Sequence, residues 1–200
     1  MSLEGELRQG LGVALNESRW LDVHVDGRRG EVRALLHVLT LPEQGPEPKD
    51  PRRVLRCWGV SRLAVSLRRG PLADDEVPAE PLDLGALSAA VRSFGAQPIY
   101  GWEFVDAPLA YIERWADRLS LDEVLGEPKG DEHRLYLFQE EAERCLELCA
   151  WFEDLTITDG KARTVPVEDF LAGGRRWWDA LYAGDRRVQG HGIVATRQDG

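Results

Sequence analysis

The feature that most constrains this fold is a strict alternation of apolar and polar residues on both sides of the segment Gly27-Arg28-Arg29-Gly30. Alternation with a period of two is typical of β-strands with one buried and one solvated face. Residues 20–26 and 31–40 therefore predict an antiparallel hairpin around a tight turn. Its buried face would contain only hydrophobic side chains: Leu21, Val23, Val25, Val32, Ala34, Leu36 and Val38. Its register would pair residues across the strands: Asp26 with Glu31, His24 with Arg33, and Asp22 with Leu35.

The rest of the chain adds further strands and two helices. Strand-like patterns recur in short segments separated by turn residues: 54–58, 63–68, 98–105, 118–124, 133–139, 145–152 and 162–165. Asp83 can cap a helix that runs to Phe94, and Pro166 can open a second helix that ends at Gly184. The sequence therefore predicts an α+β fold, built mainly from antiparallel sheet with the C-terminal helix packed on a sheet.

Two features bear on domain organisation. Residues 71–81 form an acidic segment bounded by prolines, which favours a linker between an N-terminal β unit (1–70) and a C-terminal α+β unit (82–200). Residues 54–66 and 146–158 also echo each other as strand, turn and strand. A duplication would give two related halves, although strand periodicity alone also produces such echoes. One compact domain is equally compatible with this chain length.

One short stretch, Gly59-Val60-Ser61-Arg62-Leu63-Ala64-Val65, resembles a segment of known families. It is similar to a strand–turn–strand segment, Gly-Val-x-x-Leu-x-Val, in small uncharacterised bacterial β-rich proteins. Some of those families are regarded as toxin-immunity proteins, so the resemblance implies a protein that binds and blocks a partner. The second copy of the segment departs from this pattern, since Trp151 replaces the glycine. No functional residue is carried over from the resemblance.

Charge and cysteine content limit the partners and the compartment. The net charge is −10, and residues 101–200 hold 12 basic and 21 acidic side chains, a balance of −9. Such a surface repels nucleic acid and anionic lipid and attracts a basic protein. The sequence has no apolar run near the roughly 20 residues of a membrane span, no signal peptide pattern and only three cysteines. These features predict a cytoplasmic protein, and the preference for arginine over lysine is typical of GC-rich bacterial genes.

No sequence motif specifies a reaction, a metal or a cofactor. The nucleophile-elbow, zinc-protease, dinucleotide-binding and phosphate-loop patterns are all missing from the sequence. The leading hypothesis is therefore a non-catalytic binding protein without a cofactor, whose acidic surface engages a basic protein partner. The candidate contacts are acidic residues in and beside the predicted strand at 145–152: Glu140, Glu141, Glu143, Glu147, Glu153 and Asp154.

The alternative hypothesis is a small metal-dependent enzyme. Asp22, His24 and Asp26 alternate along one predicted strand, so two carboxylates and an imidazole point to the same face. Such groups can bind a divalent metal or act as a general base. The same pattern also fits the solvated face of an amphipathic strand, with nearby arginines as charge partners.

Overall fold

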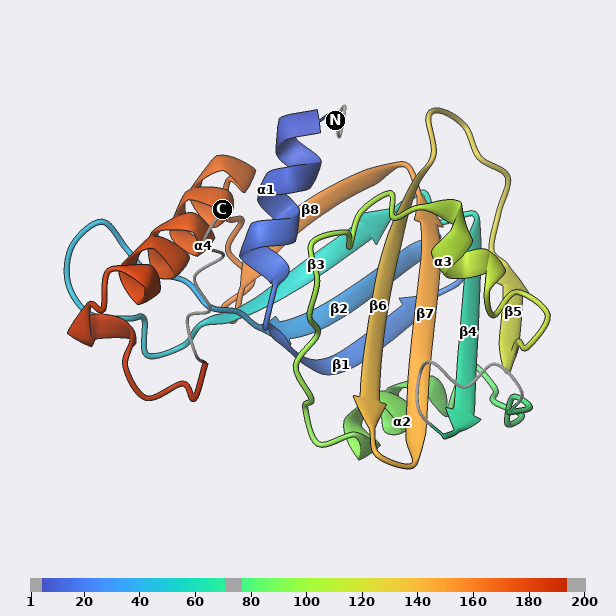
Figure 1. The fold of residues 1–200 in the computed structure, drawn as a ribbon. Helices are drawn as coiled ribbons and strands as arrows, with labels where there is room; N and C mark the ends of the chain where they lie inside the picture. Colours follow the sequence, from blue (N-terminus) through green and yellow to red (C-terminus); the bar gives the residue numbers. More distant parts are fainter. Residues whose placement is uncertain (1–4, 71–76, 194–200) are drawn as a thin grey trace.

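A computed structural model describes residues 5–70 and 77–193 of the chain (Figure 1). Within these residues, eight strands form two antiparallel sheets of four strands each. The first sheet has the order β1 (Arg19–Asp26), β2 (Glu31–His37), β3 (Arg52–Trp58) and β8 (Asp154–Asp159). The second sheet has the order β5 (Leu121–Val124), β4 (Arg62–Arg69), β7 (Arg144–Phe152) and β6 (His133–Glu141). The predicted α+β fold, built mainly from antiparallel sheet, is confirmed.

Helices flank the two sheets. The described residues form α1 (Gly5–Leu15), α2 (Leu87–Ser93), α3 (Leu109–Glu113), α4 (Val167–Tyr182) and the short 3-10 helix η1 (Arg186–Val188). The carboxylate of Asp83 accepts a hydrogen bond from the amide of Ala86 at 2.8 Å, just before α2. α4 starts directly after Pro166, and Gly184 follows its end with a φ of 68°, as the sequence predicts. Within the described ranges, 5–70 and 77–193, no helix is long and apolar enough to cross a membrane.

The hairpin of β1 and β2 has the predicted register. The pairs are Asp26 with Glu31, His24 with Arg33, and Asp22 with Leu35. A β-bulge between Trp20 and Asp22 changes which side chain enters the core at the start of β1. Trp20 is fully buried there, whereas Leu21 is only half-buried. The prediction for Leu21 is wrong because one extra residue in a strand reverses the alternation beyond it.

Two chain segments pass from one sheet to the other and hold the sheets together. Residues 59–61 connect β3 to β4, and Glu153 connects β7 to β8. Because β3 pairs with β8 and β4 pairs with β7, the two segments that echo each other in the sequence lie side by side (Figure 1). Strands from before and after residues 71–81 therefore share both sheets and one hydrophobic core. Residues 71–76 themselves lie outside the described residues.

The predicted strand over residues 98–105 is wrong. The segment passes between the sheets and meets them at isolated bridges: Pro98 with Arg19, and Val105 with Leu135. Gly101 has a φ of 120° and interrupts the extended backbone between these bridges. The directions of its aromatic side chains are therefore set by the loop and not by strand alternation. Residues 162–165 likewise form a single bridge in place of the predicted strand.

α4 packs its first turn on the core and its later turns on α1. Phe170 belongs to the main hydrophobic cluster, together with residues of both sheets. Gly174 faces α1, where an added Cβ atom would lie 2.6 Å from the Cα atom of Ala14. Nearby, the indole Nε1 of Trp178 donates a hydrogen bond to the carbonyl of Val13 at 3.0 Å. The close approach of the two helices therefore requires that residue 174 has no side chain.

We expect the Gly174→Ala variant to lower the free energy of unfolding by about 1–3 kcal/mol, because the new methyl group would collide with helix backbone. Urea denaturation followed by circular dichroism measures this loss. Gly5→Ala is the matched control, since nothing lies within 4 Å of a Cβ atom added there. Equal stability of the two variants would contradict the close helix packing.

A buried acid on the outer face of the first sheet joins two strands. Glu31 is fully buried and accepts hydrogen bonds from Arg33, its neighbour on β2, and from Arg56 on β3. The guanidinium of Arg56 also lies 3.9 Å above the ring of Trp58. Hydrogen bonds from the two arginines, Arg33 first, lower the pKa of Glu31 from 4.5 to about 2 despite its burial. Ionised Glu31 therefore stabilises the pairing of β2 with β3.

This arrangement predicts a defined loss of stability in acid. Because the pKa of Glu31 is lower in the folded state, its contribution is complete above pH 4.5 and is lost as the pH falls toward about 2. The difference in unfolding free energy between the wild type and Glu31→Gln should therefore shrink over this range. Denaturation at several pH values measures it. A difference that stays constant down to pH 2 would contradict the assignment.

Candidate functional site

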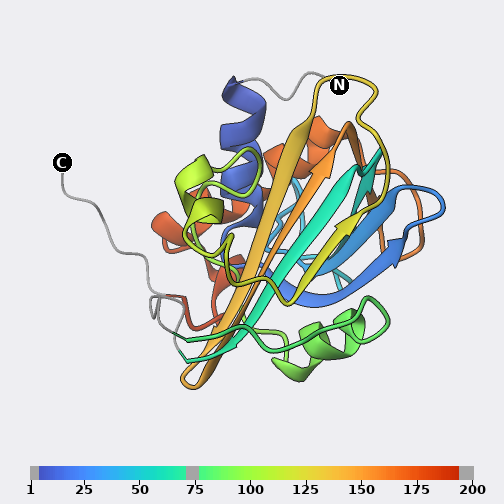
Figure 2. The ribbon, with the colours of Figure 1, turned by 90° about the vertical axis from the view of Figure 1, so that its right-hand side faces the viewer.

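The outer face of the second sheet is covered by the segment 104–119, which includes α3. Figure 2 shows α3 on the side of this sheet that faces away from the first sheet. Ile112 and Trp115 of this covering segment are buried against the sheet. They form a second, small hydrophobic cluster with side chains from β4, β6 and β7: Ala64, Tyr136, Phe138 and Cys149. The second sheet is therefore buried on both faces, unlike most antiparallel sheets.

A charged group lies inside this covered layer. Glu147, in the middle of β7, is fully buried and accepts hydrogen bonds from three side chains on three segments. Arg114 donates at 2.7 Å and the hydroxyl of Tyr136 donates at 2.6 Å, both to Oε1, while buried Arg68 donates to Oε2. Burial raises the pKa of Glu147, and the hydrogen bonds from Tyr136 and Arg114 oppose this effect. The carboxylate thus connects β4, β6 and the covering segment to β7.

The same layer contains buried hydrogen-bond donors that have no acceptor. These are the Nε and Nη1 atoms of Arg68, the indole Nε1 of Trp115 and the hydroxyl of Ser66. Buried polar atoms are nearly always paired, so each of these donors calls for a partner such as an ordered water, an ion or a bound group. One buried carboxylate facing two arginines also leaves this group with a net positive charge. The covered layer is therefore more polar than a purely structural layer requires.

An aromatic pocket opens beside the charged group. It has a volume of about 240 Å³ and lies between residues 100–104, α3 and β6. Tyr100, Trp102 and Tyr111 line it and are 46%, 55% and 41% exposed, respectively. Its inner wall is formed by further aromatic residues and by the arginine that contacts Glu147: Phe104, Arg114, Tyr136 and Phe138. Concave, mainly aromatic pockets with a few polar groups are the usual form of a binding site.

Two carboxylates lie at the rim of the aromatic pocket. The hydroxyl of Tyr100 donates to Glu140 at 2.9 Å, and burial together with this bond raises the pKa of Tyr100 to about 12. A hydrogen bond to Glu103 raises the pKa of Tyr111. Burial also raises the pKa of Tyr136 far above its usual range. All three phenols are therefore neutral at physiological pH, and the rim carries negative charge.

The predicted acidic contact residues do not form one surface. Glu140, Glu141 and Glu143 lie at the turn between β6 and β7, whereas Glu153 and Asp154 lie at the other end of β7. The two groups are about 27 Å apart along the strand, at ~3.4 Å per residue. Glu147 lies between them and is fully buried, so its assignment as a surface contact is wrong. Of this set, Glu140 accepts the hydrogen bond from Tyr100 at the rim of the aromatic pocket.

The alternative set, Asp22, His24 and Asp26, does not converge on one point. Asp22 accepts hydrogen bonds from Ser88 at 2.6 Å and Arg92 at 3.2 Å, which fix α2 along the edge of the first sheet (Figure 2). Asp26 lies near the arginine of the turn that follows it. No group of three or more His, Cys, Asp or Glu side chains that could hold a metal is found among the residues the structure describes.

Sequence reasoning missed the aromatic pocket because it interpreted residues 98–105 as a strand. A signal was present, since five aromatic residues fall within 16 positions: Tyr100, Trp102, Phe104, Tyr111 and Trp115. Alternation would place the first three on one face of a strand, buried together. In the loop they separate, with Phe104 buried and Trp102 exposed.

Comparison with known proteins gives no guide to this site. No family model matches the chain, and neither a curated protein nor a solved structure matches it. The resemblance of residues 59–65 to immunity-type proteins therefore stays a prediction. The function of the pocket follows only from its own residues and their geometry.

We expect Glu147→Gln to lower the free energy of unfolding by about 3 kcal/mol or more, because two arginines would lose the charge that compensates them. Urea denaturation at neutral pH measures the loss. Glu143→Gln removes a carboxylate from the exposed turn at the start of the same strand and should change stability by less than about 0.5 kcal/mol. Equal effects of the two changes would contradict the central position of Glu147.

Proposed function

We propose that this protein is a non-catalytic binding protein that holds a basic segment of a protein partner at the aromatic pocket of the second sheet. One observation carries the proposal. Three aromatic side chains, Tyr100, Trp102 and Tyr111, are each more than 40% exposed around one pocket whose rim carries carboxylates. Exposed aromatic residues gathered at a concave site are typical of interaction surfaces.

The chemistry of the pocket favours a cationic guest. Aromatic ring faces attract ammonium and guanidinium groups, most strongly in the case of tryptophan. Glu103 and Glu140 add negative charge at the rim, where a bound arginine or lysine side chain would meet it. Arg114 at the inner wall donates to Glu147, which it shares with Arg68, so the negative charge that meets a cationic guest comes from the rim and not from the inner wall. An arginine or lysine of the partner would therefore be held between aromatic rings and rim carboxylates.

The surrounding charge supports a protein partner. Residues 101–200, which supply the whole lining of the pocket apart from Tyr100, have a net charge of −9. This excess of acid steers a basic protein toward the site and repels nucleic acid. A role in which binding blocks the partner would be of the immunity type that residues 59–65 predict.

The ionisable groups of the pocket support binding more than catalysis. The pKa of Tyr100 is raised to about 12, and that of Tyr136 is raised further by burial and by Glu147. Neither phenol is therefore ready to accept or release a proton near neutral pH. The oxygens of Glu147 already accept three hydrogen bonds. These groups position a guest and hold the pocket wall.

Affinity capture with the full chain tests the proposal. The wild type should retain a basic protein from a lysate of its native cells at low salt, and a salt step should release it. The double change Trp102→Ser/Tyr111→Ser should lower affinity for the purified partner at least about 30-fold, the size expected for removal of interface aromatic anchors. Calorimetry with the purified pair measures this affinity.

Val124→Ser is the matched control for this experiment. Val124 is 75% exposed but does not line the pocket, so its change removes exposed apolar surface elsewhere. This variant should bind the partner as the wild type does. Unchanged affinity of the double variant, or an equal loss in Val124→Ser, would contradict the proposal.

A further inference from the structure

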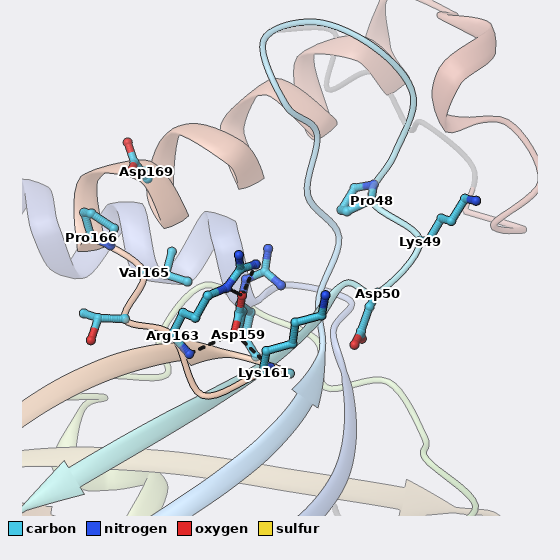
Figure 3. Close-up of a pocket in the computed structure, with 12 residues that line it drawn as sticks. Pro48, Lys49, Asp50, Asp159, Lys161, Arg163, Val165, Pro166 and Asp169 are labelled. Atoms are coloured by element: carbon cyan, nitrogen blue, oxygen red, sulfur yellow. Dashed lines mark hydrogen bonds and ion pairs between the residues drawn. The ribbon is translucent and has the colours of Figure 1, made fainter.

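A second cavity of different chemistry lies at the far end of the first sheet. It is an open cleft of about 630 Å³ between the loop at 48–50, the turn after β8 and the start of α4 (Figure 3). Four basic side chains line it: Lys49, Arg53, Lys161 and Arg163. Two of the three lysines in this acidic chain therefore lie at one cleft. None of the residues of the aromatic pocket contributes to this cleft.

The carboxylates around the cleft are already engaged. Asp159 accepts hydrogen bonds from Arg163 at 2.7 Å and from the amides of Lys161 and Arg163. Asp50 is held by Arg52, at 2.8 and 2.9 Å. Figure 3 shows Lys161 and Arg163 rising from the turn toward α4, while Asp169 points away from them. The cleft lining holds four basic and three acidic side chains, and Arg52 engages one of these acids, so the positive charge of the cleft is not fully compensated.

Arg53 shows this excess most clearly. Its side chain is half-buried, and its Nη1 atom donates to the carbonyl of Arg52 at 2.8 Å. Its Nε atom is buried and has no acceptor. Neither Arg53 nor the lysines Lys49 and Lys161 form an ion pair with any carboxylate in residues 5–70 and 77–193. Asp159 and Asp50 favour the charged form of Arg53 only from beyond ion-pair distance, and burial lowers its pKa more strongly than they raise it. A half-buried guanidinium without a paired acid is costly, so an anion in the cleft would stabilise it.

We propose that this cleft binds a small phosphorylated molecule, whose phosphate group is held by Arg53, Lys161 and Arg163. The three cations come from two segments of the cleft lining, β3 and the turn after β8, so an oxyanion between these segments can contact cations from both. A guanidinium presents a planar set of donors that matches phosphate oxygens, and lysine adds a point charge. The volume of the cleft exceeds that of one phosphate group, which leaves room for the rest of the molecule.

Binding of inorganic pyrophosphate to the full chain tests this inference. Calorimetry should show saturable binding at low ionic strength that weakens as sodium chloride is added. Thermal unfolding should also shift upward with pyrophosphate concentration, because a ligand of the folded state stabilises it. Arg53→Met and Lys161→Met should each weaken binding at least about tenfold, the equivalent of one lost charge-assisted hydrogen bond.

Two controls separate a specific site from general charge. Arg28→Met removes one exposed positive charge from the turn at the opposite end of the first sheet and should leave pyrophosphate binding unchanged. Lys161 is exposed, so its variant should fold normally even if Arg53→Met is destabilised. No saturable binding by the wild type, or equal losses in Arg28→Met and Lys161→Met, would overturn the inference. The outcome is independent of the aromatic pocket, because none of these residues lines it.

Discussion

The second sheet and its aromatic pocket depend on the hydrogen bonds that the buried carboxylate of Glu147 accepts. Two arginines and a tyrosine from three different segments donate to this buried carboxylate. Arginines inside a protein are tolerated when an acid compensates their charge, and one buried acid here serves two of them. Its position in the middle of β7 therefore fixes where the covering segment lies on the sheet.

The aromatic pocket is a consequence of that attachment. Arg114 is held by Glu147, and Tyr136 reaches the same carboxylate from β6, so both side chains form a fixed inner wall. Trp102 and its neighbours lie on a loop that passes over this wall between two isolated bridges, at Pro98 and Val105. A rigid inner wall and exposed rings lower the entropic cost of binding, which is the general advantage of a preorganised site.

The sequence predicted those parts of the fold that have one buried and one solvated face. The alternation in β1 and β2 specified their register correctly, because one face of that hairpin remains open to solvent. The alternation pattern could not reveal the burial of Glu147. A charged residue in an alternating strand is expected to be exposed, and the sequence pattern does not show that a second layer covers this strand. The aromatic pocket was missed for a related reason: an irregular loop, which has no period, sets its side chains.

The binding of basic side chains by the aromatic pocket can be tested directly by titrating the isotope-labelled full chain with N-acetyl-arginine amide. Nuclear magnetic resonance follows the indole N–H of Trp102. The Trp102→Phe variant identifies this signal by its loss. If the pocket binds basic side chains, the Trp102 signal will shift saturably, the shift will decrease in high salt, and N-acetyl-glutamate amide will cause no comparable shift. No shift with the arginine probe, or equal shifts with both probes, would contradict the assignment of the pocket as a site for basic side chains.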